Sequence, residues 1–192
     1  MKRLWVGLGI GAVFALVLIF IGESFVSARN AMVAKNEAVD QSYAEVNVQQ
    51  QRRLDLIPNL VASVKGYVSE ETTVLTNIAN ARAGVMAASD RASSIRANTA
   101  LDIAVSPLLR LQEAYPNLKA DAQFRTLTDE LAGTENRISV ARGRYNRTLE
   151  DYNVYIAQFP NSLWAGSRFP RRDEYFKGNP ENGTAPKVDF NK

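Results

Sequence analysis

The chain has 192 residues, with 23 basic and 20 acidic side chains and neither histidine nor cysteine. Lys2 and Arg3 carry most of the net charge of +3, so the rest of the chain is nearly neutral and gives no clustered basic surface for nucleic acid. The absence of cysteine excludes disulfides and thiolate catalysis, and the absence of histidine removes the commonest general base and metal ligand. We therefore expect no enzyme activity, no cofactor and no small-molecule substrate.

An uncharged apolar stretch, residues 4–22, opens the chain. As a helix it would rise ~28 Å, close to the hydrocarbon thickness of a bilayer. We predict that residues 1–28 form a membrane anchor with the start of a juxtamembrane helix. The basic residues before the stretch favour a cytoplasmic N-terminus, with the bulk of the chain periplasmic or extracellular. The alternative is a signal peptide cleaved after Ala28, although the apolar run is longer than the usual signal-peptide core.

The next segment shows apolar residues at alternating spacings of three and four, which indicates a helix continuing from the anchor. Its seam holds two polar residues, Gln50 and Arg53, among Val39, Tyr43, Val46, Ile57, Leu60, Val64 and Tyr67. Pro58 cannot donate to the carbonyl of Leu54, so we predict a kink or a break near 54–57. Ser69 is the expected N-cap of the next helix.

Three further helical stretches are predicted up to residue 118. The first covers 70–88 and the second covers 91–105. Ser106 as N-cap with Pro107 at the first helical position predicts a separate short helix over 108–114, which ends at the prolyl turn 115–117.

The last helix, predicted over 119–158, has the clearest pattern. One face carries Phe124, Leu127, Leu131, Thr134, Ile138, Ala141, Tyr145, Leu149, Tyr152, Ile156 and Phe159. We interpret this stripe as an intramolecular core seam; a groove for a partner is the alternative.

These segments predict an all-α fold: an N-terminal transmembrane helix, then an antiparallel bundle of about four long helices over residues 29–160. Residues 161–192 form a tail rich in proline, glycine and aromatic residues. Because disordered segments are poor in aromatics, we expect the tail to strap across the bundle or to dock on a partner.

The first cluster of polar candidates surrounds the expected helix break and consists of Arg52, Arg53, Asp55, Pro58 and Asn59. In the structural interpretation, which we favour, Arg53 pairs with an acidic residue of the last helix such as Glu130 or Glu135. In the functional interpretation, the break is a ligand or partner site.

The second cluster lies on the last helix and consists of Glu135, Asn136, Arg137, Arg142, Tyr145 and Asn146. Glu135 and Arg142 are two turns apart, so they share a face without touching each other. We expect a buried polar network that fixes helix register, and no catalytic site, since no nucleophile–base pair is evident.

Three stretches resemble a known family. QRRLDLIPNLVASVKGY at 51–67, LTDELAGTENRISVARGRYNRTLEDYNVYIAQFP at 127–160 and APKVDF at 185–190 are similar to the signatures of LemA-family bacterial membrane proteins. The resemblance implies one N-terminal membrane helix, a LemA-like helical bundle over 29–160, no established enzymatic activity and a link to membrane quality control and envelope functions. It assigns no functional residues.

The leading hypothesis is a single-pass protein of the bacterial inner membrane that acts as a non-enzymatic scaffold or adaptor, with membrane protein quality control as a candidate process. Its expected partners are the bilayer and a second copy of itself, another membrane protein, or both, without nucleic acid. Two alternatives are a membrane-associated hydrolase that works without histidine or cysteine, and a lipid-surface-binding protein that uses the amphipathic juxtamembrane helix.

Overall fold

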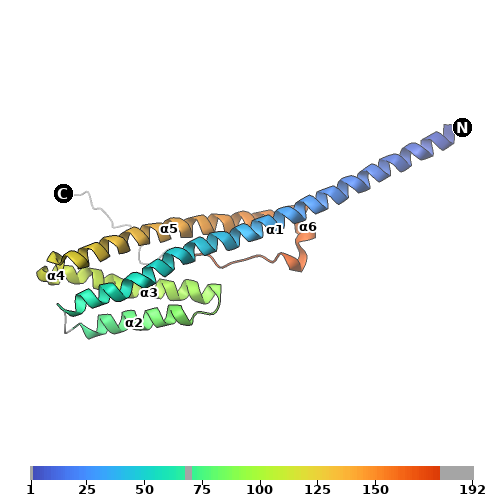
Figure 1. The fold of residues 1–192 in the computed structure, drawn as a ribbon. Helices are drawn as coiled ribbons and strands as arrows, with labels where there is room; N and C mark the ends of the chain where they lie inside the picture. Colours follow the sequence, from blue (N-terminus) through green and yellow to red (C-terminus); the bar gives the residue numbers. More distant parts are fainter. Residues whose placement is uncertain (1, 68–70, 178–192) are drawn as a thin grey trace, which may run out of the picture. The chain divides into compact units, whose positions relative to one another are not determined.

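The computed structural model describes residues 2–67 and 71–177. The described residues contain helices and no strand, which confirms the predicted all-α class (Figure 1). The elements in chain order are α1 (Lys2–Lys65), α2 (Thr72–Ala87), α3 (Arg91–Ala114), α4 (Pro116–Ala120), α5 (Ala122–Ala157), α6 (Asn161–Ala165) and the 3₁₀ turn η1 (Gly166–Arg168). The APKVDF ending at 185–190 lies outside the described residues.

The chain divides into two compact units. The first comprises Met1–Ser42 with Arg147–Arg172, and the second comprises Tyr43–Asn146 with Asp173–Lys192. Both α1 and α5 therefore contribute residues to each unit.

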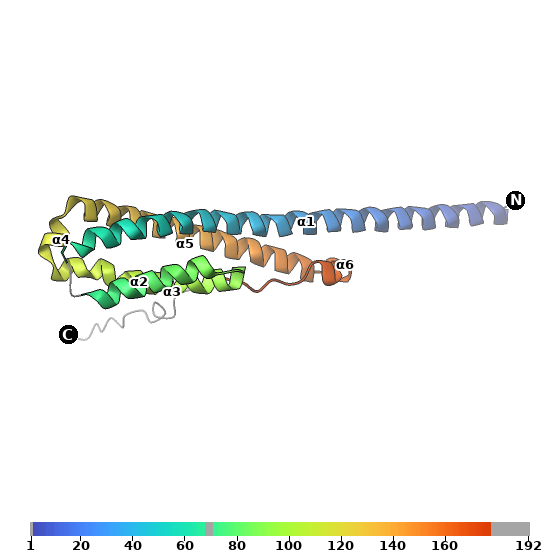
Figure 2. The same ribbon diagram turned by 60° about the horizontal axis from the view of Figure 1, so that its bottom comes forward.

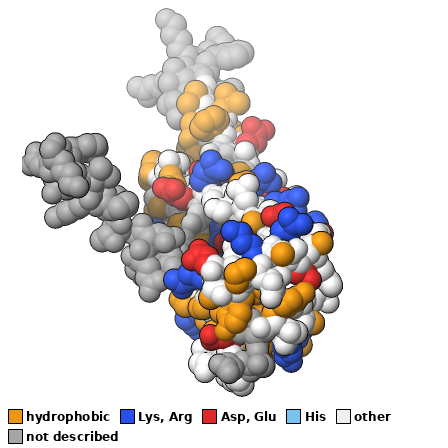
Figure 3. Space-filling model, turned by 90° about the vertical axis from the view of Figure 1, so that its left-hand side faces the viewer, with side chains coloured by type: hydrophobic (Ala, Val, Ile, Leu, Met, Phe, Trp, Pro, Cys, Tyr) orange, Lys and Arg blue, Asp and Glu red, His pale blue; other side chains and the backbone are white. Residues whose placement is uncertain are grey.

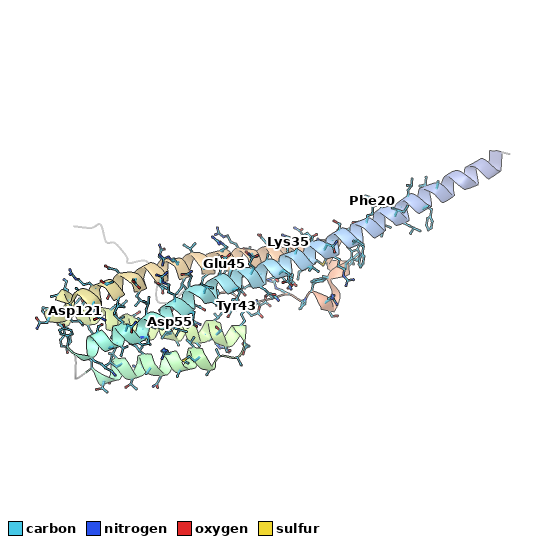
Figure 4. All side chains as sticks on the ribbon, viewed as in Figure 1. Phe20, Lys35, Tyr43, Glu45, Asp55 and Asp121 are labelled. Carbon is cyan, nitrogen blue, oxygen red and sulfur yellow. The ribbon has the colours of Figure 1, made fainter. Side chains whose placement is uncertain are left out.

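The first unit begins with the apolar part of α1. Its large apolar side chains from Val13 to Ile21 are about half to three-quarters exposed, and Phe20 reaches 73%. Figure 4 shows Phe20 projecting from α1 where no other described element lies beside it. By length and composition, α1 could cross a membrane.

Farther along the first unit, side chains of α1, α5 and α6 become buried. Met32 of α1 and Tyr152 of α5 are both fully buried. The rings of Phe25 and Trp164 meet edge to face with centroids 5.5 Å apart, which links α1 to α6.

The second unit holds a continuous hydrophobic core. In Figures 1 and 2, α2 and α3 lie side by side, and the short connection between them makes them antiparallel. The core draws on α1, α2, α3, α4 and α5, and its members are Leu54, Ile57, Leu60, Val64, Ile78, Leu101, Val105, Leu108, Leu118, Phe124 and Leu131.

Of the kink or break predicted near Pro58, the break is absent, and the separate helix predicted after Pro107 is wrong. Helix α1 passes through Pro58 without a break, and α3 passes through Pro107, so the expected helix over 108–114 is the end of α3. The Ser106 hydroxyl donates to the carbonyl of Asp102 inside α3 (3.0 Å) instead of capping a new helix. An internal proline costs about 3 kcal/mol. Burying Ile57 or Leu108 beside it gains about 1.5–3 kcal/mol each, so packing can offset that cost.

Other boundaries also differ from the predictions. The N-cap of α2 is Glu71, whereas the expected cap, Ser69, lies outside the described residues. Asp90 caps α3 by accepting from the Ser93 backbone N–H at 2.9 Å. Phe159, expected on the buried stripe of the last helix, is 82% exposed because α5 ends at Ala157.

Candidate functional site: a polar groove and the segment that borders it

Four charged side chains meet in the second unit. Arg53 of α1 donates through Nη1 to Asp102 Oδ1 of α3, and the same nitrogen lies 3.1 Å from Glu135 Oε2 of α5. Arg142 of α5 donates through Nη1 to the other oxygen of Asp102 at 3.0 Å. Asp102 thus bridges the two arginines and ties three helices together.

Burial explains why Arg53 needs two carboxylates. Its side chain is 5% exposed, whereas the side chains of Asp102 and Glu135 are 23% and 48% exposed. A guanidinium removed from water is stable only with opposite charge and hydrogen bonds close by. Arg53 occupies a seam position of α1, and its neighbours Leu54 and Ile57 belong to the apolar core.

Several donors of the two arginines stay unused. Arg53 Nε, Arg142 Nε and Arg142 Nη2 are buried and have no hydrogen-bond partner among the described residues. In a guanidinium, Nε–H and the adjacent Nη–H point the same way and form a fork that matches the two oxygens of a carboxylate or phosphate. In Arg142 both donors of this fork are buried and have no hydrogen-bond partner among the described residues.

Arg53 and Arg142 line a groove of about 870 Å³ in the second unit. Its charged lining carries four cations, Arg53, Arg110, Arg142 and Lys177, against two carboxylates, Asp102 and Glu135. The walls also include apolar side chains, namely Ile103, Val105, Pro107, Leu109, Leu131 and Phe176. The groove thus combines a basic excess with apolar surface.

The segment after η1 borders this groove and is held on α5 by a tyrosine and an asparagine. The Tyr145 hydroxyl donates to the carbonyl of Glu174 at 3.0 Å. The Asn146 side chain donates to the carbonyl of Phe176 (2.7 Å) and accepts from its backbone N–H (3.0 Å). The side-chain amide thereby pairs with both backbone groups of one residue, as a neighbouring strand would.

The same arrangement recurs seven residues later, within the first unit. The Tyr152 hydroxyl donates to the carbonyl of Pro170 at 3.0 Å. Asn153 donates to the carbonyl of Arg172 (2.6 Å) and accepts from its N–H (3.0 Å). We call each Tyr-Asn pair with its backbone partners a clamp. The two clamps lie one heptad apart on α5 and hold backbone groups of Pro170, Arg172, Glu174 and Phe176. This part of the tail is therefore fastened to α5, as expected for a strap.

Aromatic and cationic side chains surround the first clamp. The Phe176 ring lies 5.4 Å from that of Tyr145 and 6.4 Å from that of Tyr43, measured between centroids. The Arg91 guanidinium lies 4.3 Å from the centroid of Tyr43, a residue of α1 labelled in Figure 4. The Arg142 guanidinium lies 5.2 Å from the Phe176 ring, so the clamped segment also contacts the charged cluster.

Burial also affects the tyrosine of the second clamp. Tyr152 is fully buried, and desolvation raises the pKa of its hydroxyl above the ordinary value of 10.0, against an opposing effect of Arg172. The hydroxyl therefore stays protonated and remains a donor to Pro170.

The structure brings together five of the predicted site residues. Arg53, Glu135 and Arg142 meet in the charged cluster, and Glu135 is one of the two partners expected for Arg53. Tyr145 and Asn146 form the first clamp. The other predicted residues are exposed and do not line the groove: Arg52, Asp55, Pro58, Asn59, Asn136 and Arg137.

Sequence reasoning missed Asp102, Tyr152 as a hydrogen-bond donor, and Asn153. Asp102 offered little signal, because nothing local shows which helix an acid will face. The clamps did leave a signal, since the dipeptide Tyr-Asn occurs at 145–146 and again at 152–153, one heptad apart.

Comparison with known proteins places the chain in a family. Two curated relatives, magnetosome proteins MamQ 2 and MamQ 1 of Paramagnetospirillum magneticum (strain ATCC 700264 / AMB-1), are each 28% identical to it over 81 residues. That alignment covers 42% of this chain and 30% of each relative, so the chain spans under a third of their length. The model of the LemA family matches residues 42–190, most of the chain. The chain belongs to the LemA family.

Proposed function

We propose that this LemA-family protein is a single-pass membrane protein whose helical part is a non-enzymatic scaffold or adaptor of the bacterial envelope. The carrying observation is the continuity of α1. One helix, Lys2–Lys65, contains both the exposed apolar stretch and the buried seam around Arg53. No loop separates the proposed anchor from the helical core, because both lie on α1.

Exposure of the apolar stretch supports the anchor. Side chains such as Leu16 and Phe20 are 66% and 73% exposed, and burying apolar surface gains roughly 25 cal/mol per Å². A bilayer supplies that burial along the whole stretch.

The chemistry of the polar residues supports a non-enzymatic role. The sequence contains no histidine and no cysteine, and the groove is lined chiefly by arginines, carboxylates and apolar side chains. Ser106, one of its two serines, donates to a helix carbonyl and is not paired with a base in the described contacts. Membrane protein quality control is the candidate process.

The proposed place is the bacterial inner membrane, with the N-terminus in the cytoplasm, because Lys2 and Arg3 precede the apolar stretch. A role limited to lipid surfaces is less well supported. In Figure 3, Lys and Arg side chains are interspersed with Asp and Glu on the face in view, and no broad cationic face of the kind that binds anionic lipid is seen there.

Crosslinking in intact membranes, followed by detergent purification and mass spectrometry, tests the proposal. A foreign protein recovered in stoichiometric amount supports an adaptor, and self-crosslinked copies alone support a homo-oligomeric scaffold. The matched control carries an unrelated transmembrane helix in place of residues 4–22 and keeps the groove and clamps. Recovery of neither product, with the chain washed off membranes by carbonate, would contradict the proposal.

Topology is testable independently, since the chain has no native cysteine. Ser167 is exposed within η1, so Ser167→Cys offers one reactive thiol. We expect an impermeant maleimide to label it in intact spheroplasts and to miss a cysteine added before Met1. The reverse pattern would place the bulk of the chain in the cytoplasm.

A further inference from the structure

We propose that the turn that follows α5 docks on the headgroup layer of the same bilayer that the apolar stretch of α1 spans. We call this turn the α6 corner and define it as residues 158–165, which lie in the first unit together with that stretch. Phe159, Leu163 and Trp164 are its proposed contacts with lipid. The proposal rests on the membrane anchor of the proposed function and adds a second contact between the chain and the membrane.

The α6 corner lies just beyond the apolar stretch. The Trp164 ring meets Phe25 of α1 edge to face, with centroids 5.5 Å apart. Phe25 is three residues past the end of the stretch at residue 22, a rise of ~4.5 Å. The headgroup layer is about 5–8 Å thick on each side of the hydrocarbon core. With the stretch in the hydrocarbon, Phe25 therefore lies within the headgroup layer, and the Trp164 ring lies beside it. Figures 1 and 2 both show α6 next to α1 at the foot of its exposed part.

Large apolar side chains of the α6 corner are exposed. Phe159 and Leu163 are 82% and 69% exposed, and Val26, next to Phe25 on α1, is 55% exposed. Phe159 is exposed because α5 ends at Ala157, so the buried stripe of this helix does not continue onto the corner. Exposed apolar side chains gathered at one place mark a surface that interacts with lipid or protein. Here the bilayer is the occupant that the anchor already brings to this level.

The α6 corner is an ordered turn. The Asn161 side chain donates to the carbonyl of Tyr155 in the last turn of α5 at 3.1 Å. The backbone N–H of Leu163 donates to the carbonyl of Pro160 at 3.0 Å. Asn161 and Ala165, which flank Leu163 in α6, are 9% and 7% exposed. The turn is therefore fixed in advance, and docking costs little ordering of the chain.

The charge around the α6 corner suits lipid headgroups. Residues 152–172 contain three arginines and no acidic residue. Two of these arginines, Arg168 and Arg171, are exposed. On α1, Glu23 and Arg29 are both exposed and balance each other. Arginine is attracted to anionic headgroups, and tryptophan is enriched at the membrane–water interface. The corner thus combines an interfacial aromatic residue, exposed apolar side chains and neighbouring cations, as interfacial membrane anchors do.

Spin labelling of the full-length chain in lipid nanodiscs tests the proposal, because the chain has no native cysteine. The nanodiscs contain phosphatidylethanolamine and phosphatidylglycerol, and both of their faces are open to solvent. Phe159→Cys and Leu163→Cys each carry a nitroxide. Its collisions are measured with oxygen, which concentrates in lipid, and with a water-soluble nickel complex. The matched control is Val33→Cys, at a 43% exposed position of α1 that lies ~16 Å past the apolar stretch. We expect the ratio of oxygen to nickel collisions to be at least about threefold higher at both corner positions than at position 33.

Two results would overturn the lipid contact. A ratio at the corner equal to that at position 33 would place Phe159 and Leu163 in water. Low collision rates with both reagents would show that protein covers them, as in an interface with a second copy. Leu16→Cys, at a 66% exposed position inside the apolar stretch, reports the anchor separately. A label in lipid at position 16 with a corner in water refutes this inference alone. A label in water at position 16 refutes the anchor of the proposed function and, with it, the lipid contact.

Tryptophan fluorescence gives a second measurement without a spin label. Trp5→Phe leaves Trp164 as the single tryptophan of the chain. Lipid brominated in the part of its acyl chains nearest the headgroup should quench the Trp164 emission. In the control chain, which combines Trp5→Phe, Trp164→Phe and Val33→Trp, quenching should be no more than about a third as strong. Quenching that is absent from the first chain, or equal in the two chains, would overturn the proposal.

Discussion

Removing one asparagine of the two clamps should release the C-terminal segment locally. Asn153 is 3% exposed and makes two hydrogen bonds to the backbone of Arg172, at 2.6 and 3.0 Å. Asn153→Ala removes both partners and leaves the Arg172 N–H and carbonyl to find water. Asn146→Ala does the same to Phe176.

The magnitude follows from the number of bonds lost. A hydrogen bond contributes about 0.5–1.5 kcal/mol net, so two contribute about 1–3 kcal/mol. Since 1.4 kcal/mol is tenfold in an equilibrium constant, local opening at the altered clamp should rise by roughly 5- to 150-fold. The neighbouring tyrosine hydroxyl still holds one carbonyl, which keeps the rest of the segment in place.

Amide hydrogen exchange read by NMR gives the assay, because it resolves single residues. In Asn153→Ala, exchange of the Arg172 amide should rise by at least about fivefold more than that of the Phe176 amide, each relative to the parent chain, and in Asn146→Ala the order should reverse. Asn136→Ala, at an exposed position of the same helix, is the matched control and should change neither amide. Equal acceleration of both amides in either variant would refute the assignment of separate clamps, and unchanged exchange would refute the hydrogen bonds.

Three further predictions concern stability and ionisation. Arg53→Ala removes the cation at the centre of the charged cluster. Because its two acids are partly exposed, we expect the free energy of unfolding to fall by about 2–4 kcal/mol, which lowers the Tm measured by circular dichroism by about 4–16 °C. An unchanged Tm would exclude a structural role for the pairing. The Tyr152 phenol should ionise above pH 10.0, and Tyr152→Phe should remove this step from the absorbance titration at 295 nm. The stability that the neutral phenol contributes is present below pH 10.0 and is lost as the pH rises through its raised pKa. Loss of a step in the ordinary range instead would contradict the burial of Tyr152. Hydrogen bonds from the Phe124 backbone N–H and then from Tyr67 lower the pKa of Asp121 below 3.8. Asp121→Asn should therefore be less stable than the parent chain above about pH 4, with the gap closing as the pH falls further, and a gap independent of pH would contradict the shift.

Periodic features were predictable from the sequence because they depend on local spacing. The α1 seam was predicted through Val39, Val46 and Leu60, all of which are buried. The stripe of α5 was predicted through Phe124 and Tyr145, also buried, and failed at Phe159, which lies beyond the helix. Repeated apolar spacing over many residues averages out local errors, whereas a helix end depends on one or two residues.

Features that depend on competition between local and tertiary effects were not predictable. Pro58 predicted a kink or break and Pro107 a new helix start, yet α1 and α3 continue through them, because burial of neighbours such as Ile57 and Leu108 can offset the cost. The partner Asp102 could not be found because its pairing joins residues 49 positions apart in the chain.

The charged cluster is not an efficient source of folding free energy. Replacing all members of a buried ion cluster with apolar residues of similar volume is often neutral or stabilising, whereas removing one partner alone is destabilising. What an apolar replacement cannot do is make the directed hydrogen bonds of the cluster. The two oxygens of Asp102 are divided between Arg53 and Arg142, so one acid joins side chains of α1 and α5 to α3. The cluster therefore makes better physical sense as a device that fixes how α1, α3 and α5 meet than as a source of folding energy.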